Sequence, residues 1–210
     1  NAADPRLLEL FLRHRKLSLA QATVVLDALL DWRDTDDLPR MNGAEKDYYQ
    51  GLSEPYMPRN GRIEDPAEFF LLKGTAPLAG GFAAEDVFTV HNSEGKINVN
   101  ALGPAMLDFV VEGDAGRRQA YLDMRQANTA LDAAMARQIF GAERFAALEP
   151  FLRYDDGAAA LYYTITATGQ AGLSPEAGTG NGGGTELTIH ALVRLLANGY
   201  QVLSWQERPS

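Results

Sequence analysis

Apolar residues recur at helical spacing near the start of the chain. They are Leu7, Leu8, Phe11 and Leu12. Asp4 and Pro5 stand immediately before them, and we expect a helix to begin there because Asp is a favourable N-cap and Pro suits the first helical position. Ser18 and Gln21 have the spacing of a capping box, in which each side chain bonds a free backbone N–H. They predict a second helix that ends near Trp32.

The helical pattern is interrupted by residues 33–65, in which Asp, Gly, Pro, Asn and Tyr dominate. Such residues favour turns and loops, with room for one short helix at 43–49. A further helix is expected from Asp65-Pro66 to Gly74, because Gly readily takes the left-handed conformation that ends helices.

Residues that favour β-structure are concentrated in five short stretches. Two lie in the middle of the chain, at 87–90 and 97–100. Three lie near its end, at 161–168, 187–196 and 200–207. The Thr, Tyr, Ile and Val content of these stretches predicts two short central strands and a three-stranded antiparallel sheet.

The turns of this predicted sheet have different signals. Asn198-Gly199 favours a two-residue hairpin, because both residues tolerate positive φ. The Gly-rich run at 169–184 lacks the Lys-Ser/Thr of a phosphate loop and predicts a flexible loop. A three-stranded sheet needs a packing partner, and no long helix adjoins it in this sequence. We therefore expect an N-terminal helix, absent from this chain, to cover it.

Residues 1–12 resemble residues 100–111. An Asn, an Ala, a Pro and a Leu are identical at aligned positions, and an acidic residue follows the Leu in both stretches. Residues 104–152 also read as helical, with breaks at 114–116 and near Gly141. Two small helical subdomains of one kind, each entered through an Asn-Ala turn and a Pro-started helix, explain the similarity. Chance similarity over so short a stretch is the alternative.

Composition and charge limit the possible functions. The 210 residues are 46% hydrophobic and 22% charged, which is enough for a packed core. The formal net charge of −9 opposes binding to nucleic acid or anionic membranes and favours cations. The absence of Cys excludes disulfides and thiolate metal sites, and no apolar run is long enough to span a bilayer. The chain starts at Asn1 without Met, which leaves open ordinary processing or removal of a membrane anchor.

The turn-rich stretch between residues 31 and 60 carries the most informative chemistry. Its oxygen-bearing side chains include Asp31, Asp34, Asp36, Asp37, Glu45 and Asn60. Calcium takes roughly six to eight oxygen ligands, and alternating acids in a loop can point at one ion. Gly43 permits the tight turn that would return Glu45 to the others, although the spacing is not that of an EF-hand. A solvated acidic loop is the alternative, and the interleaved Trp and Tyr residues count against it.

No motif marks a catalytic centre. His14, His91 and His190 lie far apart and lack zinc-site spacing, and the Gly-x-Ser-x-Gly motif is missing. We therefore expect no enzyme, with a calcium-dependent hydrolase as a weighed alternative. A nucleic-acid-binding module of helix-hairpin-helix type is the other alternative; the basic segment 13–16 favours it and the net charge opposes it.

Several short motifs follow one another in a recognisable order. They are Asp31-Trp32-Arg33-Asp34-Thr35-Asp36-Asp37, Arg40, Gly43-Ala44-Glu45, Tyr48-Tyr49, Pro55-Tyr56 and Asn60. This order resembles the signature of the K-type minor pseudopilins of bacterial type II secretion systems. The resemblance continues through Glu68, Lys73-Gly74, 87–90, 97–101 and 203–205, and so covers nearly the whole chain. Departures at 69–72 and 101–103 leave open a general or a specialised secretion system.

The resemblance implies an α+β fold. A pseudopilin-type antiparallel sheet, packed on an N-terminal anchoring helix that is absent from this chain, would carry a large inserted helical domain made of two related small helical subdomains. We expect the first helical subdomain at 1–32, the acidic loop region at 33–65, a connecting helix and short strands at 66–99, the second helical subdomain at 100–152, and the C-terminal sheet at 159–208.

The resemblance also implies a place in a secretion apparatus. Such a protein is not an enzyme; it sits at the tip of the pseudopilus, caps the filament and helps to initiate its assembly for protein export. Its partners are the I-type and J-type minor pseudopilins, with a secreted substrate or the outer-membrane channel as a further contact, and no nucleic acid. The absent helix would anchor it in the bacterial inner membrane, with the present chain in the periplasm.

Calcium in the acidic segment is the last implication of the resemblance. One or two Ca²⁺ ions would stabilise the helical domain. The ligand candidates are Asp34, Asp36, Asp37 and Glu45, with Asp31 and Asn60 as further candidates.

Overall fold

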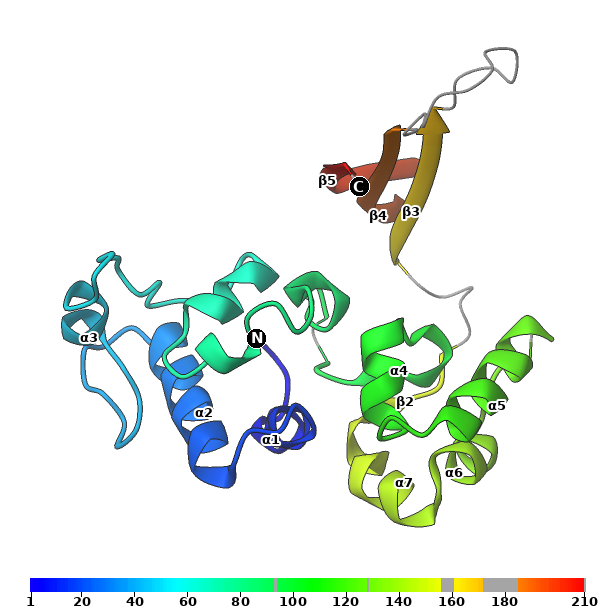
Figure 1. The fold of residues 1–210 in the computed structure, drawn as a ribbon, viewed down its shortest axis with the longest axis horizontal. Helices are drawn as coiled ribbons and strands as arrows, with labels where there is room; N and C mark the ends of the chain where they lie inside the picture. Colours follow the sequence, from blue (N-terminus) through cyan, green and yellow to red (C-terminus); the bar gives the residue numbers. More distant parts are fainter. Residues whose placement is uncertain (93, 128, 156–160, 172–184, 210) are drawn as a thin grey trace, which may run out of the picture. The chain divides into compact units, whose positions relative to one another are not determined.

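The computed structural model describes residues 1–92, 94–127, 129–155, 161–171 and 185–209. The chain divides into two compact units, residues 1–156 and 157–210. The first unit is mainly helical and the second is a three-stranded sheet (Figure 1). The chain is therefore α+β, as predicted. No helix in the described parts is both long and apolar enough to cross a membrane.

The first two helices form as the capping signals predict. Helix α1 (Pro5–His14) begins after Asp4, whose carboxylate accepts a hydrogen bond from the Arg6 N–H. All four apolar residues of its predicted core face are buried. Helix α2 (Leu19–Arg33) begins at Ser18, and both hydrogen bonds of the capping box are present. Local sequence and tertiary packing agree in this part of the chain.

The middle of the chain consists of short elements. They are helix α3 (Lys46–Gln50), the 3₁₀ segments η1 (Pro66–Leu71), η2 (Ala76–Leu78), η3 (Ala84–Asp86) and η4 (Val99–Ala101), and strand β1 (Ile97–Asn98). The short helix predicted near 43–49 is thus present, three residues further along the chain. The helix predicted up to Gly74 stops earlier, because the Thr75 hydroxyl binds the backbone carbonyls of Phe70 and Leu72.

The strand predicted at 87–90 is not formed. These residues lie in a turn and an extended segment, and the Phe88 N–H donates to the Ala84 carbonyl instead of to a neighbouring strand. A β-forming sequence becomes a strand only where a partner strand is available, and none of the described segments lies alongside it. The strand predicted at 97–100 is shortened to β1.

The rest of the helical unit contains four further helices. They are α4 (Pro104–Val110), α5 (Ala115–Gln126), α6 (Ala133–Phe140) and α7 (Ala142–Leu148), followed by η5 (Glu149–Phe151) and strand β2 (Leu152–Arg153). Both predicted breaks are correct: Asp114 caps the start of α5, and Gly141 separates α6 from α7 at a φ of 84°. Strand β2 pairs in parallel with β1.

The predicted internal repeat is visible in the hydrogen bonds. The side-chain amide of Asn1 donates to the carbonyl of Ile63 at 2.8 Å and accepts from its N–H at 2.9 Å. Asn100 makes the same pair of bonds with Leu131, at 3.1 and 2.7 Å. In both copies the Asn precedes a Pro-started helix, and the bonded residue comes shortly before an Asp-capped segment.

The two copies differ in the connection after their second helix. In the second copy, residues 127–130 suffice to lead from α5 back to Leu131. In the first copy, residues 34–62 separate α2 from Ile63, and we call this segment the insertion. It contains α3 and most of the acidic motif. The acidic stretch is therefore an extra loop on an otherwise repeated helical unit.

One continuous core runs through both copies. Phe11 of α1 contacts Phe109 of α4, with ring centroids 5.5 Å apart, and His14 lies 5.6 Å from the same ring. His14 also lies 3.1 Å from a carboxylate oxygen of Asp108. Buried residues of both helical regions belong to a single cluster. The two copies are thus joined as one compact unit.

The second unit is an antiparallel sheet of β3 (Tyr162–Ala171), β4 (Thr185–Leu196) and β5 (Gly199–Pro209), in that order. All three predicted strands are present and extend beyond their predicted ends. Of the predicted Gly-rich loop, residues 169–171 belong to β3, and residues 172–184 lie outside the described residues.

The hairpin between β4 and β5 is shifted by one residue from its predicted place. Leu196 pairs with Gly199, so Ala197 and Asn198 form the turn instead of Asn198 and Gly199. The register between the two strands also shifts at Leu192 and Val193, where β5 contributes one extra residue. Sequence signals thus located the turn to within one residue.

One face of this sheet is apolar and exposed. Ile165, Ala191 and Trp205 lie side by side across the three strands, so they share a face. Ile165 is 52% exposed and Trp205 is 56% exposed. Apolar side chains of this size normally lie against another element, so this face is a candidate packing surface.

Candidate metal centre

Asp31 fixes the start of the insertion from the last turn of α2. It is fully buried, and its oxygens accept hydrogen bonds from the Ala44 N–H at 2.8 Å and from the Arg40 N–H. A buried carboxylate needs such donors, because its hydration is lost. Asp31 therefore folds residues 40–44 back onto the end of α2.

Gly43 lies at the point where this returning backbone meets α2. A Cβ atom at this position would lie 1.8 Å from Asp31 Oδ2 and 3.2 Å from the Asp27 carbonyl. The glycine predicted to permit a tight turn is thus required by close approach to a carboxylate. Asp27 holds the adjacent residue, since its Oδ2 accepts from the N–H and the side-chain amide of Asn42.

Arg40 lies among the acidic side chains. Its Nη1 donates to Asp31 Oδ1 at 2.5 Å and to Asp34 Oδ2 at 2.6 Å. The two carboxylates raise the pKa of the guanidinium. Arg40 thus neutralises part of the acidic charge, which the sequence analysis did not foresee although Arg40 belongs to the recognised motif.

Glu45 carries a buried carboxylate that has no hydrogen-bond donor among the described residues. The residue is 4% exposed, and neither carboxylate oxygen has a hydrogen-bond partner among the described residues. Burial, together with the neighbouring Asp31, Asp34, Asp37 and Asp36 carboxylates, raises the pKa of Glu45 to about 7. A buried carboxylate with two free oxygens is unfavourable unless a cation or a proton neutralises it.

Two further oxygens in the insertion lack partners. They are Oδ1 of Asp34 and Oδ1 of Asn60, both buried. Asn60 has a φ of 46°, a left-handed conformation that Asn tolerates better than most residues. Its side-chain nitrogen lies 3.4 Å from both the Asp36 carbonyl and Asp37 Oδ1. Asn60 thereby connects the end of the insertion to the acids near its start.

The six predicted ligands occupy different positions in this arrangement. One ligand oxygen from each of Asp31, Asp34 and Glu45 lies within 4.8 Å of the others. Asp36 and Asp37 are exposed, and Asp36 Oδ1 also accepts from the Leu38 N–H. Asp31 already has several protein donors, so the oxygens best placed for a cation are those of Asp34, Glu45 and Asn60.

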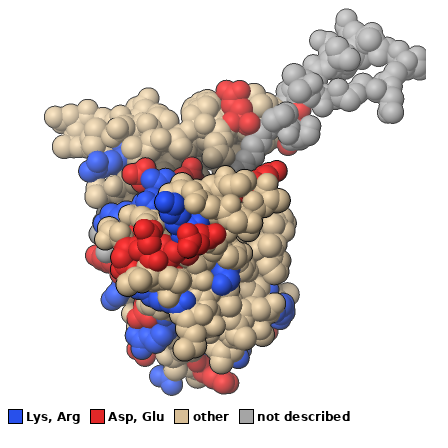
Figure 2. Space-filling view, turned by 90° about the vertical axis from the view of Figure 1, so that its left-hand side faces the viewer, with Lys and Arg blue, Asp and Glu red and all other residues tan. Residues whose placement is uncertain are grey.

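The residues fit a calcium ion in chemistry. The donors are carboxylate and amide oxygens, which hard divalent cations prefer, and nitrogen and sulfur ligands are absent from the cluster. Four buried oxygens without partners are supplied by three residues of the insertion. Acidic side chains also gather on the face of the helical unit that carries the insertion, beside basic ones (Figure 2). Asp34, Glu45 and Asn60 would hold the ion, with Asp36 and Asp37 beside them.

The far end of the insertion is fixed by Glu68, to which the sequence analysis gave no role. Its carboxylate accepts from the N–H groups of Glu64 and Asp65, both at 3.0 Å, and from Trp32 Nε1 at 3.1 Å. Arg59 Nε donates to it at 2.6 Å. Burial acts to raise the pKa of Glu68, but these donors outweigh it and the pKa is lowered. The capping-box spacing from Asp65 to Glu68 was the available signal.

Aromatic side chains support the insertion from inside. Tyr49 is fully buried; its ring centroid lies 5.2 Å from those of Trp32 and Tyr56. Its hydroxyl accepts from the Lys73 N–H at 3.3 Å. The interleaved aromatics therefore form a small core of their own, which agrees with the argument against a merely solvated loop.

Comparisons with known proteins agree with the motifs. Residues 1–79 match the family model described as type II secretion system (T2SS), protein K. A type II secretion system protein K from Klebsiella pneumoniae is 34% identical over 77 residues, which are 37% of this chain and 24% of that protein. The whole acidic motif lies inside the matched region.

The fold can be compared over the complete chain. A chain in the crystal structure of the GspK-GspI-GspJ complex, from the type II secretion system of enterotoxigenic Escherichia coli, matches with a TM-score of 0.63 and 16% identity. The match covers 100% of this chain and 72% of that chain. At this identity the likeness concerns the fold alone. Over residues 1–79 the chain matches the protein K family, so the resemblance stated from the motifs is confirmed there.

Proposed function

We propose that this chain is the part of a K-type minor pseudopilin that stands at the tip of a type II secretion pseudopilus. The matched family region and the shared fold support this role. By the resemblance, the protein is non-enzymatic, caps the filament and helps to initiate its assembly for protein export. The bulky helical unit would obstruct the addition of further subunits above it.

Assembly with I-type and J-type minor pseudopilins is part of the proposal. The similar solved chain comes from a complex of GspK with GspI and GspJ. The exposed apolar face of the sheet around Ile165 and Trp205 supplies a surface for an N-terminal anchoring helix. Such a helix would place the chain in the periplasm, attached to the inner membrane. A secreted substrate or the outer-membrane channel would be a further contact.

Calcium would act as a structural ion in this protein. The observation that carries this proposal is the set of unpartnered oxygens on Asp34, Glu45 and Asn60. A cation there would join the start, the middle and the end of the insertion. An ion that binds only the folded state raises stability in proportion to the logarithm of its concentration. The insertion would then be held in one shape at the tip.

Thermal unfolding with and without calcium tests the ion. We expect chelation to lower the melting temperature of the chain, and we expect the Asp34→Ala, Asp36→Ala double variant to lose this sensitivity. Glu64→Ala is a matched control, because Glu64 is an exposed acid outside the cluster. A wild-type melting curve that chelation leaves unchanged would sink the calcium proposal, while the family assignment would stand.

A further inference from the structure

An extended segment next to α1 has free backbone groups. Residues Thr89 and Val90 follow η3, and within the described parts of the chain their backbone N–H and carbonyl groups make no hydrogen bond. Thr89 is exposed, while Val87, Phe88 and Val90 are half-buried. This is the β-forming sequence that predicts a strand and lacks a partner strand in this chain.

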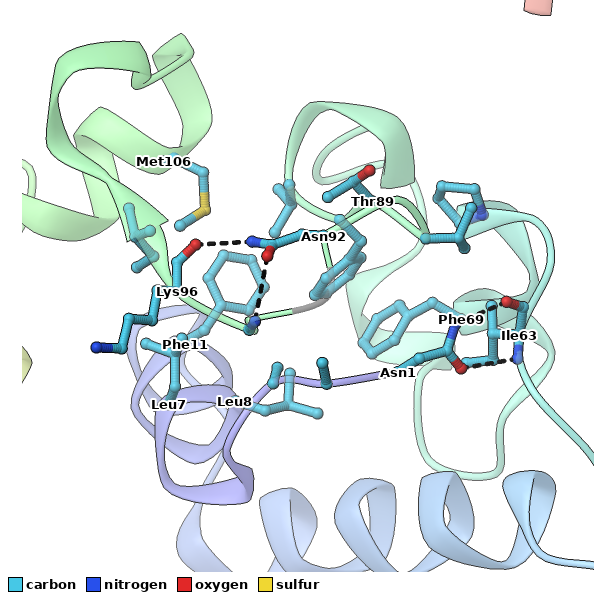
Figure 3. Close-up of a pocket in the computed structure, with 18 of the residues that line it drawn as sticks. Asn1, Leu7, Leu8, Phe11, Ile63, Phe69, Thr89, Asn92, Lys96 and Met106 are labelled. Atoms are coloured by element: carbon cyan, nitrogen blue, oxygen red, sulfur yellow. Dashed lines mark hydrogen bonds between the residues drawn. The ribbon is translucent and has the colours of Figure 1, made fainter. Parts of the chain in front are cut away.

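An apolar cavity opens beside the same segment. Its volume is about 170 Å³, and its walls come from the first residues of the chain, α1, η1, α4 and residues 87–90, 92 and 95–97. Figure 3 shows Phe11 and Phe69 bordering it, with Met106 on the side of α4 and Thr89 and Asn92 along the extended segment. The strand-forming segment is thus also a wall of the cavity.

Hydrogen bonds made by two Asn side chains fix the two ends of the cavity. At one end Asn1 binds the backbone of Ile63; at the other, Asn92 accepts from the Gly95 N–H and donates to the Lys96 carbonyl. A Cβ atom at Gly95 would lie 2.1 Å from the Ala2 carbonyl oxygen, so the two walls touch there. Collapse of the cavity would require these bonds to break.

The size of the cavity limits what it can receive. An apolar cavity of about 150 Å³ accommodates a molecule the size of benzene, whereas pockets for cofactors and drug-sized ligands begin near 300 Å³. One aromatic or branched aliphatic side chain is therefore the largest group that fits. An extended peptide delivers such a side chain while its backbone pairs with a free edge.

We propose that an extended peptide segment of a partner protein pairs with the backbone of Thr89 and Val90 and inserts one apolar side chain into this cavity. Asp86, an exposed acid three residues before Thr89, favours a basic flanking residue in the partner, whereas Glu94 is paired with Arg153. The site is separate from the acidic insertion, so the interaction needs no calcium.

Synthetic heptapeptides test the proposal directly. The probes have the sequence Lys-Thr-Val-X-Val-Thr-Lys with blocked ends, in which X is Asn, Ala, Val, Leu, Met or Phe. Two-dimensional NMR of the isotope-labelled chain measures their binding. We expect the largest shift changes at the Thr89 and Val90 amides and the Met106 methyl group. The best apolar X should bind about tenfold or more tightly than X = Asn, because a whole apolar side chain is buried.

Modified probes and matched variants separate the two parts of the proposal. N-methylation of alternate peptide amides should abolish binding, since it removes the pairing donors. Ala3→Phe should weaken binding by filling the mouth of the cavity, and Ala3→Ser should not; Ala3 is exposed, so both variants are expected to fold. Chelation of calcium should leave the affinity unchanged.

Three results would overturn the proposal. The first is that no heptapeptide shifts the named resonances. The second is that the N-methylated peptides bind as well as their parents. The third is that benzene occupies the cavity, as judged from the Met106 methyl group, while the peptides bind elsewhere or not at all. The last result would mark the cavity as a packing defect.

Discussion

At the scale of single residues, the candidate centre combines two uses of buried carboxylates. Asp31 and Glu68 are saturated with donors and hold backbone in place, whereas both oxygens of Glu45 lack partners. The difference lies in the donors that surround each side chain, since all three residues are buried. A saturated carboxylate organises the loop, and an unsaturated one remains available to a cation.

Gly43→Ala tests the close approach to Asp31. The new methyl group would lie within 1.8 Å of a carboxylate oxygen, so either the turn or Asp31 must move. We expect a loss of about 1–3 kcal/mol in unfolding free energy, together with weaker calcium binding in titration calorimetry. Gly103→Ala is the control, because its Cβ would meet nothing closer than 4.0 Å. Equal stability of the two variants would contradict the role of Gly43.

Glu45 should make the calcium-free protein sensitive to pH. Its pKa is raised from 4.5 to about 7 in the folded chain, so the folded state holds a proton that the unfolded state releases. The stability that protonation of Glu45 provides is complete below pH 4.5 and decreases as the pH rises toward 7. Denaturant unfolding in calcium-free buffer should show this decrease for the wild type and not for Glu45→Gln. If the unfolding free energies of the wild type and Glu45→Gln changed equally with pH, Glu45 would not cause the pH dependence.

At the scale of elements, an Asn side chain joins the start and the end of each copy of the repeat in the same way. Asn1 and Asn100 each bind both backbone groups of a residue beyond the second helix of their copy. Each closure brings the chain back to the start of its own first helix. The insertion extends the first closure without changing its ends.

Asn100→Ala tests this pair of hydrogen bonds in the copy where the Asn is more deeply buried. Asn100 is 3% exposed, and its loss leaves the N–H and carbonyl of Leu131 without their partners. We expect a loss of about 2–3 kcal/mol in unfolding free energy, because each unsatisfied buried group costs about 1–3 kcal/mol. Gln119→Ala, on the exposed side of α5, should change stability by less than about 0.5 kcal/mol. Chemical denaturation measures both variants.

The sequence predicted most of the fold, and the misses share a physical cause. Capping residues determine α1 and α2 locally, so their starts were predicted correctly. Pairing of strands and the ends of short helices depend on distant groups. Residues 87–90 have no partner strand among the described segments, Thr75 shortens η1, and strand pairing places the hairpin one residue before its predicted position.

The candidate centre was predicted as a set of residues, without their arrangement. Hard oxygen donors and the motif order identified the segment, and the ligand set remains a prediction. Sequence spacing does not show that Arg40 binds two of the acids, or that Asp31 is occupied by backbone donors. Those facts depend on how residues 40–44 return to α2, which is a tertiary property.

At the scale of the whole chain, the two units differ in how their apolar residues are covered. The helical unit buries a continuous core, in which Trp32 is 2% exposed. The sheet leaves Trp205 56% exposed and Tyr200 70% exposed. The helical unit therefore buries its apolar side chains within itself, while the sheet exposes several of them.

The two tryptophans report on the two units separately. In the present chain we expect acrylamide to quench Trp205 fluorescence efficiently and Trp32 fluorescence hardly at all, because of their exposures. The single-tryptophan variants Trp205→Phe and Trp32→Phe assign the signals. Under the proposed function, an anchoring helix that packs on this face should protect Trp205 from the quencher. Equal quenching of both residues would contradict the burial described here.

The insertion has ends that meet: the Gly61 N–H donates to the Trp32 carbonyl at 3.3 Å, and Asp31 and Glu68 secure the two sides. Because its ends lie close together, the insertion can be replaced by a shorter connection. The second copy closes the same gap with residues 127–130. Replacing residues 34–60 with a connection of that length also removes the hydrogen-bond donors of the buried Asp31. The shortened protein should therefore fold without metal once Asp31 is replaced by an uncharged residue of similar size.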